Sequence, residues 1–424
     1  MGYTYTPSLR NARTNPRLGA ALLLLLAGCG PSPPPAATTA PPAPPPTSAP
    51  PAPAPSPQVS PAASPAISPV ASPSAAPPGI IPTADPAIHV FLWGSAASDR
   101  DLNLARDAGF HWVKQRFEWR NIEAKGKGQF EWNEPDRLVD AIGQRGLKII
   151  ARLDNQPQWA SSSVQWPGTG PPDRLSDWTD FLQALASRYR GRIQAYEVWN
   201  EPNLAREWGD KKPDARAYMD MLTASYQTLR AADPQALVVT AGLSPTTDTA
   251  NAIPDVEYLR AMYQNGLRGS YDVLGVHAAG YKAAPCADPA MVAQDPSLTN
   301  NDPSPVDARR IYAFRHVEDM RQVMVEQGES NKQMGVLEMG WTTDQRPNSP
   351  YAWHAVSREQ QAQNLVGAFQ CARERWAPWM GFMSVIYIAE PAWTQQQEQY
   401  WWSITNPDGS PRPAYTALKD LFTR

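Results

Sequence analysis

Two short motifs carry carboxylates in settings that suggest chemistry. The first is Asn200-Glu201-Pro202, where an apolar and aromatic run ends at a proline, and the second is Glu338, which follows a short apolar stretch. Proline lacks the N–H that continues a strand ladder, so we expect Glu201 just beyond the end of a strand. Two facing carboxyl groups can hydrolyse a glycosidic bond, one as a protonated acid and the other ionised, as nucleophile or base.

The elements that must position these groups alternate along the chain from about residue 85. Segments with strand composition are separated by amphipathic segments with helical spacing. The strands are predicted at 88–93, 111–117, 147–153, 193–199, 236–241, 272–277, 333–338 and 381–388. After the sixth strand we expect a long loop over about 282–305 and then a helix at 308–327. Eight strand–helix pairs predict an α/β fold of the (β/α)8 TIM-barrel type. The alternative is a doubly wound sheet, but no Gly-rich phosphate-binding turn follows the first strand.

In such a barrel the carboxyl ends of all strands meet at one rim, where active sites form. Glu201 follows the fourth predicted strand and Glu338 ends the seventh. Three further carboxylates, Glu118, Asp154 and Glu390, also fall at or beyond strand ends. We expect these three to orient neighbouring arginines or backbone rather than to react.

At these residues the chain resembles a large clan of retaining glycoside hydrolases with (β/α)8 barrels. Members carry an Asn-Glu acid/base pair after strand four and a Glu nucleophile at the end of strand seven, the positions of Asn200-Glu201 and Glu338. Within the clan the chain looks most similar to bacterial β-xylosidases and cellulases, and residues 402–415 resemble the end of such barrels. The resemblance implies that Glu338 attacks the anomeric carbon, Glu201 supplies the proton, and Asn200 binds the sugar 2-hydroxyl.

The resemblance also directs attention to the neighbours of the nucleophile. His277 ends strand six, where members often carry a histidine followed two residues later by a tyrosine that bonds the nucleophile; here that position is Ala279 and the tyrosine is Tyr281. Either Tyr281 reaches back or the hydrogen bond is absent. Arg116 is a candidate to keep Glu338 ionised, because a nearby positive charge favours a carboxylate.

Tryptophans follow several predicted strand ends. Aromatic faces stack on pyranose rings and exclude water, so Trp208, Trp341 and Trp393 are predicted sugar platforms. The alternative is ordinary packing, since tryptophan is also a core residue. His277 is a substrate contact or a satisfied rim residue.

The first fifth of the chain has a different composition. Residues 1–28 resemble a lipoprotein signal peptide, with a basic start and a short apolar run that ends before Cys29, the predicted lipidation site. Residues 29–84 are rich in Pro, Ala and Ser and are predicted to be a disordered tether before the catalytic domain at 85–424. We therefore expect an extracytoplasmic protein that is lipid-anchored at the cell surface, or secreted.

Charge and ligand spacing limit the partners. The net charge of −3 gives no reason to expect nucleic acid, and the lipid anchor is the only expected membrane contact. The five histidines show no metal-ligand spacing, so neither metal nor cofactor is implied. Beyond Cys29, the remaining Cys286 and Cys371 form a disulfide or stay separate thiols.

Three functions remain open at this stage. The leading one is a retaining glycosidase that takes a β-linked carbohydrate substrate. The second is a catalytically weak or inactive barrel that binds glycans, for which the altered tyrosine position is the only support. The third is a cell-envelope scaffold in which the barrel acts as a spacer.

Overall fold

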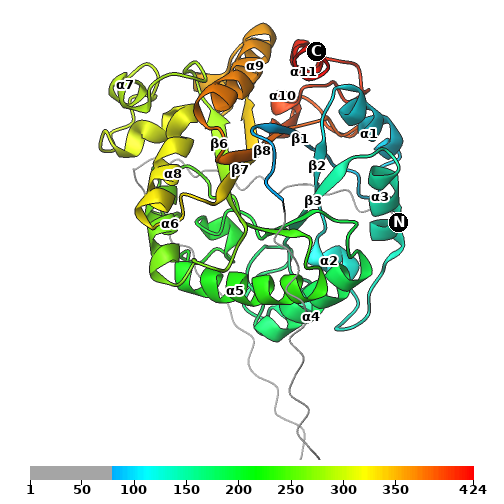
Figure 1. The fold of residues 1–424 in the computed structure, drawn as a ribbon. Helices are drawn as coiled ribbons and strands as arrows, with labels where there is room; N and C mark the ends of the chain where they lie inside the picture. Colours follow the sequence, from blue (N-terminus) through cyan, green and yellow to red (C-terminus); the bar gives the residue numbers. More distant parts are fainter. Residues whose placement is uncertain (1–78) are drawn as a thin grey trace, which may run out of the picture. The chain divides into compact units, whose positions relative to one another are not determined.

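The computed structural model describes residues 79–424, and the predicted signal peptide, Cys29 and almost all of the tether lie outside that range. Eight parallel strands pair in sequence order, and the eighth closes on the first (Figure 1). The predicted TIM barrel is therefore confirmed. The strands are β1 (Asp85–His89), β2 (Trp112–Arg116), β3 (Lys148–Leu153), β4 (Ala195–Val198), β5 (Leu237–Thr240), β6 (Val273–Gly280), β7 (Gln333–Trp341) and β8 (Met380–Val385).

Helices surround this ring of strands, as Figure 1 shows. The α-helices are α1 (Ser98–Asp107), α2 (Trp119–Ile122), α3 (Asn133–Gly143), α4 (Leu175–Arg188), α5 (Ala215–Ala232), α6 (Asp255–Gln264), α7 (Pro289–Gln294), α8 (Val317–Glu326), α9 (Arg358–Arg375), α10 (Glu398–Trp402) and α11 (Pro413–Phe422). Short 3₁₀ turns lie between them: η1 (Gln158–Ala160), η2 (Ala205–Glu207), η3 (Ala308–Tyr312), η4 (Phe314–His316) and η5 (Ala352–His354). In the part of the chain described, no helix is both long and apolar enough to cross a membrane.

Two apolar layers hold the barrel together. A larger cluster fills the space between strands and helices, and a smaller one fills the barrel interior. The interior cluster comprises Ile81, Ala87, Trp112, Ile150, Ala195, Leu237, Val239, Val273, Leu337 and Phe382. Apolar side chains fill one level of the barrel interior. The polar residues that the same strands point inward therefore lie at a different level, and the candidate site is there.

Three local expectations were wrong. The first strand is Asp85–His89 rather than 88–93, because its pairing with β8 begins at Asp85. The long loop predicted at 282–305 contains α7, which starts at Pro289 behind an Asp288 side-chain cap. The helix predicted at 308–327 is broken into η3, η4 and α8.

A disulfide ties the β6–β7 connection to the outer layer. Cys286 lies in the segment after β6 and Cys371 lies within α9, and the structure joins their sulfurs. Of the two alternatives for these cysteines, the bridge is the one observed. It fixes the loop that leaves the rim next to His277.

Candidate active site

Glu201 lies just beyond β4, where the backbone makes an unusual turn. Trp199 and Glu201 have φ values of 73° and 39°, in the left-handed region that residues other than glycine seldom occupy. The Glu201 N–H donates to the carbonyl of Gly242, 3.1 Å away beyond β5. A strained backbone conformation of this kind is kept where the surrounding contacts hold it in place, often at functional sites. The turn separates the carboxylate of Glu201 from the regular pairing of the strand.

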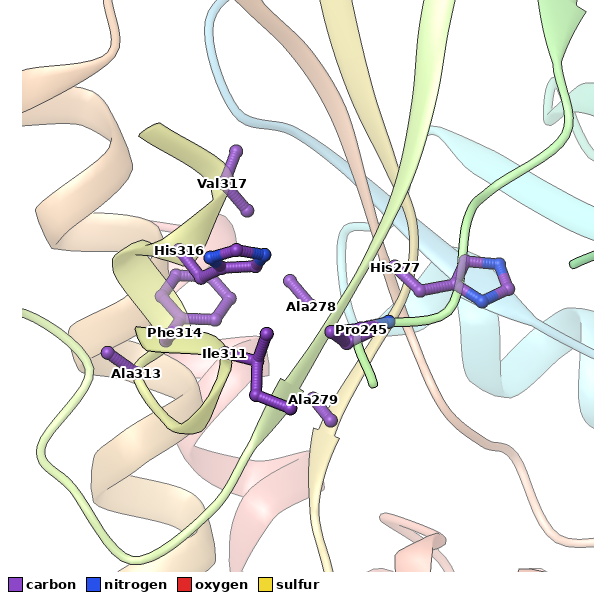
Figure 2. Close-up of a pocket in the computed structure, with 9 residues that line it drawn as sticks. All are labelled: Pro245, His277, Ala278, Ala279, Ile311, Ala313, Phe314, His316 and Val317. Atoms are coloured by element: carbon purple, nitrogen blue, oxygen red, sulfur yellow. The ribbon is translucent and has the colours of Figure 1, made fainter. Parts of the chain in front are cut away.

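His277 contacts the carboxylate of Glu201, with 3.0 Å between Nδ1 and Oε1. Gly242 makes room for its ring, since a Cβ at position 242 would lie 2.2 Å from the imidazole. Figure 2 shows the His277 ring on the opposite side of β6 from His316 and Phe314. The imidazole therefore faces the rim of the barrel, while the other side of the strand packs against the outer layer.

A register shift turns Glu338 toward the same place. Val276 pairs with Val336, but the next residue, His277, pairs with Glu338, so β7 has one extra residue at Leu337. Val336 belongs to the outer core and Leu337 to the barrel interior. Simple alternation would send Glu338 outward with Val336. A bulge of this kind re-aims a side chain, and here the Glu338 carboxylate reaches groups inside the barrel.

Three basic side chains from other strands surround Glu338. Its Oε1 lies 3.1 Å from Lys114 Nζ, 3.4 Å from Arg152 and 3.5 Å from Nδ1 of His89. Burial raises the pKa of Glu338, but the charge of Lys114 and the other neighbours hold that pKa well below its usual range. Burial also lowers the pKa of His89 to about 3, so this ring is neutral beside the carboxylate. Glu338 is therefore held ionised, as a nucleophile requires.

The buried Lys114 also binds Glu197, with 3.0 Å between Nζ and Oε2. Both side chains are fully buried in the barrel. Burial raises the pKa of Glu197, while the charges of Lys114 and Arg152 oppose that increase. Lys114 is thus shared between two carboxylates of different strands.

Glu201 is also ionised in this structure. Arg206 donates to its Oε2 over 2.6 Å, from the turn η2 five residues further along the chain. Burial raises the pKa of Glu201, but the charge of Arg206 and the hydrogen bond with His277 outweigh burial and bring that pKa to about 2. A general acid must carry its proton when the bond breaks. The ion pair with Arg206 must therefore weaken before Glu201 can serve as an acid.

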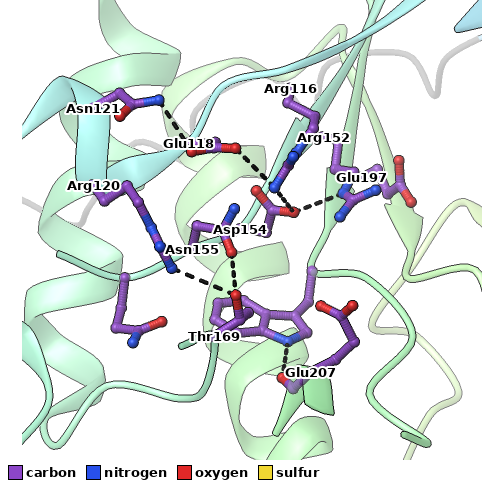
Figure 3. Close-up of polar contacts among 12 residues, drawn as sticks. Arg116, Glu118, Arg120, Asn121, Arg152, Asp154, Asn155, Thr169, Glu197 and Glu207 are labelled. Carbon is purple, nitrogen blue, oxygen red and sulfur yellow. Dashed lines mark hydrogen bonds and ion pairs between the residues drawn. The ribbon is translucent and has the colours of Figure 1, made fainter. Parts of the chain in front are cut away.

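The rim arginines are organised by carboxylates, as Figure 3 shows. Arg116 contacts Glu118 at 2.7 Å and Asp154 at 3.6 Å, and Arg152 donates to Asp154 at 2.7 Å. Glu118 and Asp154 therefore orient arginines, as the sequence predicted. Lys114 and Arg152 directly contact the nucleophile candidate, and the role expected for Arg116 stays a prediction.

The three predicted sugar platforms differ in their surroundings. Trp208 is 3% exposed and Trp341 is 0% exposed, and their rings contact other aromatic side chains of the core. This favours the packing alternative for both residues. Trp393 is 7% exposed and packs on Phe91 and Tyr387, whose rings contact His89 beside Glu338. Trp393 is therefore the platform candidate whose contacts lead to the site.

Tyr281 packs away from the nucleophile candidate. Its ring contacts Tyr312, Trp353 and His354, with centroid distances of 5.0, 5.7 and 5.0 Å. Tyr281 thus packs against a separate hydrophobic cluster that includes residues of α7 and η3. The hydrogen bond that the resemblance assigns to a tyrosine at position 279 has its counterpart in the Lys114, Arg152 and His89 contacts with Glu338.

Several buried polar atoms at the rim have no partner in the described residues. They are Oδ1 of Asn200, Nε2 of His277 and Nε2 of His89. Buried polar atoms are normally satisfied, so a group of exceptions at one place indicates a binding site. Their chemistry suits a ligand with several hydroxyls. Across residues 79–424, no cluster of His, Cys, Asp or Glu has the makings of a metal site.

The sequence reasoning missed Lys114, His89 and Arg206. Lys114 had only a weak signal: it is a charged residue in the middle of the predicted strand, but Gln115 and Arg116 beside it are polar as well. His89 was placed inside a strand rather than at its end, because the first strand was predicted three residues late. Arg206 lies in an irregular turn, and no pattern marks it.

The fold and the site can be compared with known proteins. No family model matches the chain. A β-xylosidase from Geobacillus stearothermophilus is 25% identical over 130 residues, which cover 27% of this chain and 25% of that protein. The chain therefore matches only a quarter of the length of this relative.

Solved structures resemble most of the described barrel. A family 39 glycoside hydrolase from Bacteroides cellulosilyticus WH2 has a TM-score of 0.59 at 18% identity, covering 82% of this chain and 65% of that one. A glucosidase from Croceicoccus marinus has a TM-score of 0.56 at 11% identity, over 82% and 69%. Xylanase 10B from Thermotoga petrophila RKU-1 has a TM-score of 0.52 at 11% identity, over 80% and 93%. The chain thus has the (β/α)8 fold that these glycoside hydrolases share.

Proposed function

We propose that this protein is a retaining glycoside hydrolase that cleaves O-glycosidic bonds of a β-linked poly- or oligosaccharide. One observation carries the proposal: His277 contacts Glu201 and pairs in register with Glu338, so carboxylates from β4 and β7 meet at one rim. The names of the similar proteins, a β-xylosidase, a family 39 hydrolase and a xylanase, support it.

In this mechanism the two carboxylates have different tasks. Glu338 attacks the anomeric carbon as the glycosidic bond breaks, and Glu201 gives its proton to the leaving oxygen. Glu201 then removes a proton from water, which attacks the same carbon and releases Glu338. The charges of Lys114 and Arg152 beside Glu338 support the nucleophile role, because they favour its ionised form.

The groups around the carboxylates supply binding. The unpartnered Oδ1 of Asn200 suits a sugar hydroxyl, as does Nε2 of His277. Trp393 is the proposed stacking surface, because its contacts lead to the ring of His89. The β-xylosidase and xylanase likenesses make a xylose unit the first sugar to test.

The proposal extends to the place where the enzyme works. The sequence before residue 79 suggests export and lipid attachment at Cys29, which would anchor the barrel outside the cytoplasm. The Cys286–Cys371 disulfide fits an oxidising compartment. Mass spectrometry of the N-terminal peptide tests this directly: acyl chains on Cys29 are expected, and an unmodified Cys29 in membrane fractions would contradict the anchor.

A second function, glycan binding without cleavage, has two observations in its favour. Ala279 replaces the tyrosine of the resembled clan, and Arg206 keeps Glu201 ionised. Under this alternative the barrel binds oligosaccharides and releases no sugar from them.

A panel of chromogenic aryl β-glycosides, including the xyloside, separates the two functions. We expect hydrolysis by the wild-type protein and loss of most activity in Glu338→Gln, which removes the nucleophile. In Glu201→Gln, activity should fall least for the aryl glycosides with the best leaving groups, since their leaving oxygen departs with the least need of a proton. Glu118→Gln, a rim carboxylate bound to Arg116, is the matched control. Wild-type binding of xylooligosaccharides without hydrolysis of any glycoside would favour the binding function.

A further inference from the structure

Arg206 contacts Glu201, the proposed proton donor to the leaving group. Its guanidinium contacts Glu201 Oε2 at 2.6 Å, and its Nε lies 3.5 Å from Glu207. The side chain is nevertheless 67% exposed. An arginine has five N–H donors, so these two contacts leave others available to a ligand.

The contact with Glu201 and the proposed chemistry are in conflict. The first step needs a proton on Glu201, whereas a close guanidinium favours the unprotonated carboxylate. Something must take the guanidinium away from Glu201 at the time the glycosidic bond breaks. An anion supplied by the substrate would do this without leaving Arg206 unpaired.

A cavity of about 220 Å³ lies beside this ion pair. Its lining includes Leu204, Arg206, Ser244, Thr246, Asp248 and Asn251. The lining comes from the segments that follow β4 and β5, so the cavity is on the side of the proton donor rather than that of β7. It is smaller than the ~300–1,000 Å³ of typical drug-sized ligand sites. It suits one small ring rather than a long chain.

The cavity lining carries one positive group, Arg206, and several hydroxyl and amide groups. It also carries one carboxylate, Asp248, whose Oδ1 accepts hydrogen bonds from the backbone N–H groups of Ala250 and Asn251. Asp248 is therefore engaged with its own turn. Arg206 remains as the group that can recognise charge, and a guanidinium matches a carboxylate in two parallel hydrogen bonds.

We propose that this cavity is the leaving-group subsite and that it takes a sugar bearing a carboxylate, a uronic acid, which binds Arg206 and releases Glu201. This rests on the proposed glycosidase function. As Arg206 turns to the substrate, Glu201 takes a proton from solvent. That proton passes to the glycosidic oxygen while Glu338 forms its bond to the anomeric carbon, so charge and atoms balance.

The test uses two disaccharides with the sugar that the aryl glycoside panel identifies. In one, this sugar is β-linked to glucuronic acid; in the other, to the methyl ester of glucuronic acid. The ring and the leaving hydroxyl are the same, and the two compounds differ only in the charge and in the methyl group of the ester. A charge-assisted hydrogen bond predicts that kcat/KM at pH 7 is about tenfold higher for the acid.

Two variants assign the effect to the arginine. In Arg206→Gln the preference for the acid should disappear. The basic limb of the pH profile with a neutral aryl glycoside should move to higher pH, because Glu201 loses the charge that favours its unprotonated form. Arg216→Gln, an exposed arginine at the start of α5, is the matched control and should keep the preference. Circular dichroism verifies that both variants fold.

The outcomes separate this inference from the proposed function. Equal rates for acid and ester, a preference for the ester, or a preference that survives Arg206→Gln would overturn the subsite while leaving the glycosidase intact. Failure to hydrolyse every aryl glycoside would overturn the proposed function, and the subsite with it.

Discussion

Replacing Lys114 with methionine should move the acid limb of the pH profile. Lys114 Nζ lies 3.1 Å from Glu338 Oε1, and its side chain is fully buried. A unit charge about 4 Å away contributes ~4 kcal/mol at an effective dielectric constant of 20, or about three pKa units. Because Arg152 and His89 remain near Glu338, we expect the pKa of Glu338 to rise by roughly two units.

The acid limb of kcat/KM reports the nucleophile in the free enzyme, so it should shift upward by the same amount. The assay is kcat/KM between about pH 3 and pH 9 with the best aryl glycoside of the panel. Lys148→Met, an exposed lysine at the start of β3, is the matched control and should leave the limb in place.

Stability must be followed in the same experiment. The substitution leaves Glu197 buried without its cation, and breaking a buried pair costs about 3–5 kcal/mol. If Lys114→Met does not fold, the double variant with Glu197→Gln removes the uncompensated charge and carries the pH measurement. A folded variant whose acid limb stays within about 0.3 units of wild type would refute the electrostatic reasoning.

Three further predictions concern the supports of the site. Gly242→Ala places a Cβ 2.2 Å from the His277 ring, so kcat should fall at least ~10-fold; unchanged kinetics would show that the imidazole position is unimportant. Cys371→Ser removes the Cys286–Cys371 bridge, which joins residues 85 positions apart, and should lower the free energy of unfolding by up to ~4 kcal/mol. Urea denaturation measures this change, and an unchanged midpoint would argue against the bridge. Burial lowers the pKa of His316, but its aspartate partners outweigh burial and raise that pKa to about 10. Protonated His316 therefore stabilises the folded protein fully below its unfolded pKa near 6.5, and this stabilisation is lost as the pH rises through 10. His316→Gln should flatten that alkaline decline, and an equal decline in both proteins would contradict the assignment.

The barrel and its two carboxylates could be predicted because their signals are local. Strand composition, helical spacing and a proline after Glu201 lie within a few residues of one another, so they survive without tertiary information. The limits of the elements were harder to predict. Asp85 and Pro86 look unlike strand residues, but β8 pairs with them and extends the strand toward the N-terminus.

The electrostatic partners could not be predicted in the same way. The contact of Lys114 with Glu338 joins residues 224 positions apart, and Arg206 reaches Glu201 from an irregular turn. The bulge at Leu337 that aims Glu338 inward depends on pairing with β6. Tryptophan shows a different limitation: the residue type suits both stacking and packing, and only the ring contacts in the structure distinguish Trp393 from the others.

The covalent intermediate tests the central claim most directly. A 2-deoxy-2-fluoro glycoside with an activated leaving group, of the sugar that the panel identifies, should accumulate the glycosyl-enzyme, because the fluorine slows its hydrolysis. Peptide mass spectrometry of the full-length protein should then find one sugar attached to Glu338, and none in Glu338→Gln. Attachment to another carboxylate, or turnover that gives the inverted anomer by proton NMR, would contradict a retaining mechanism with Glu338 as nucleophile.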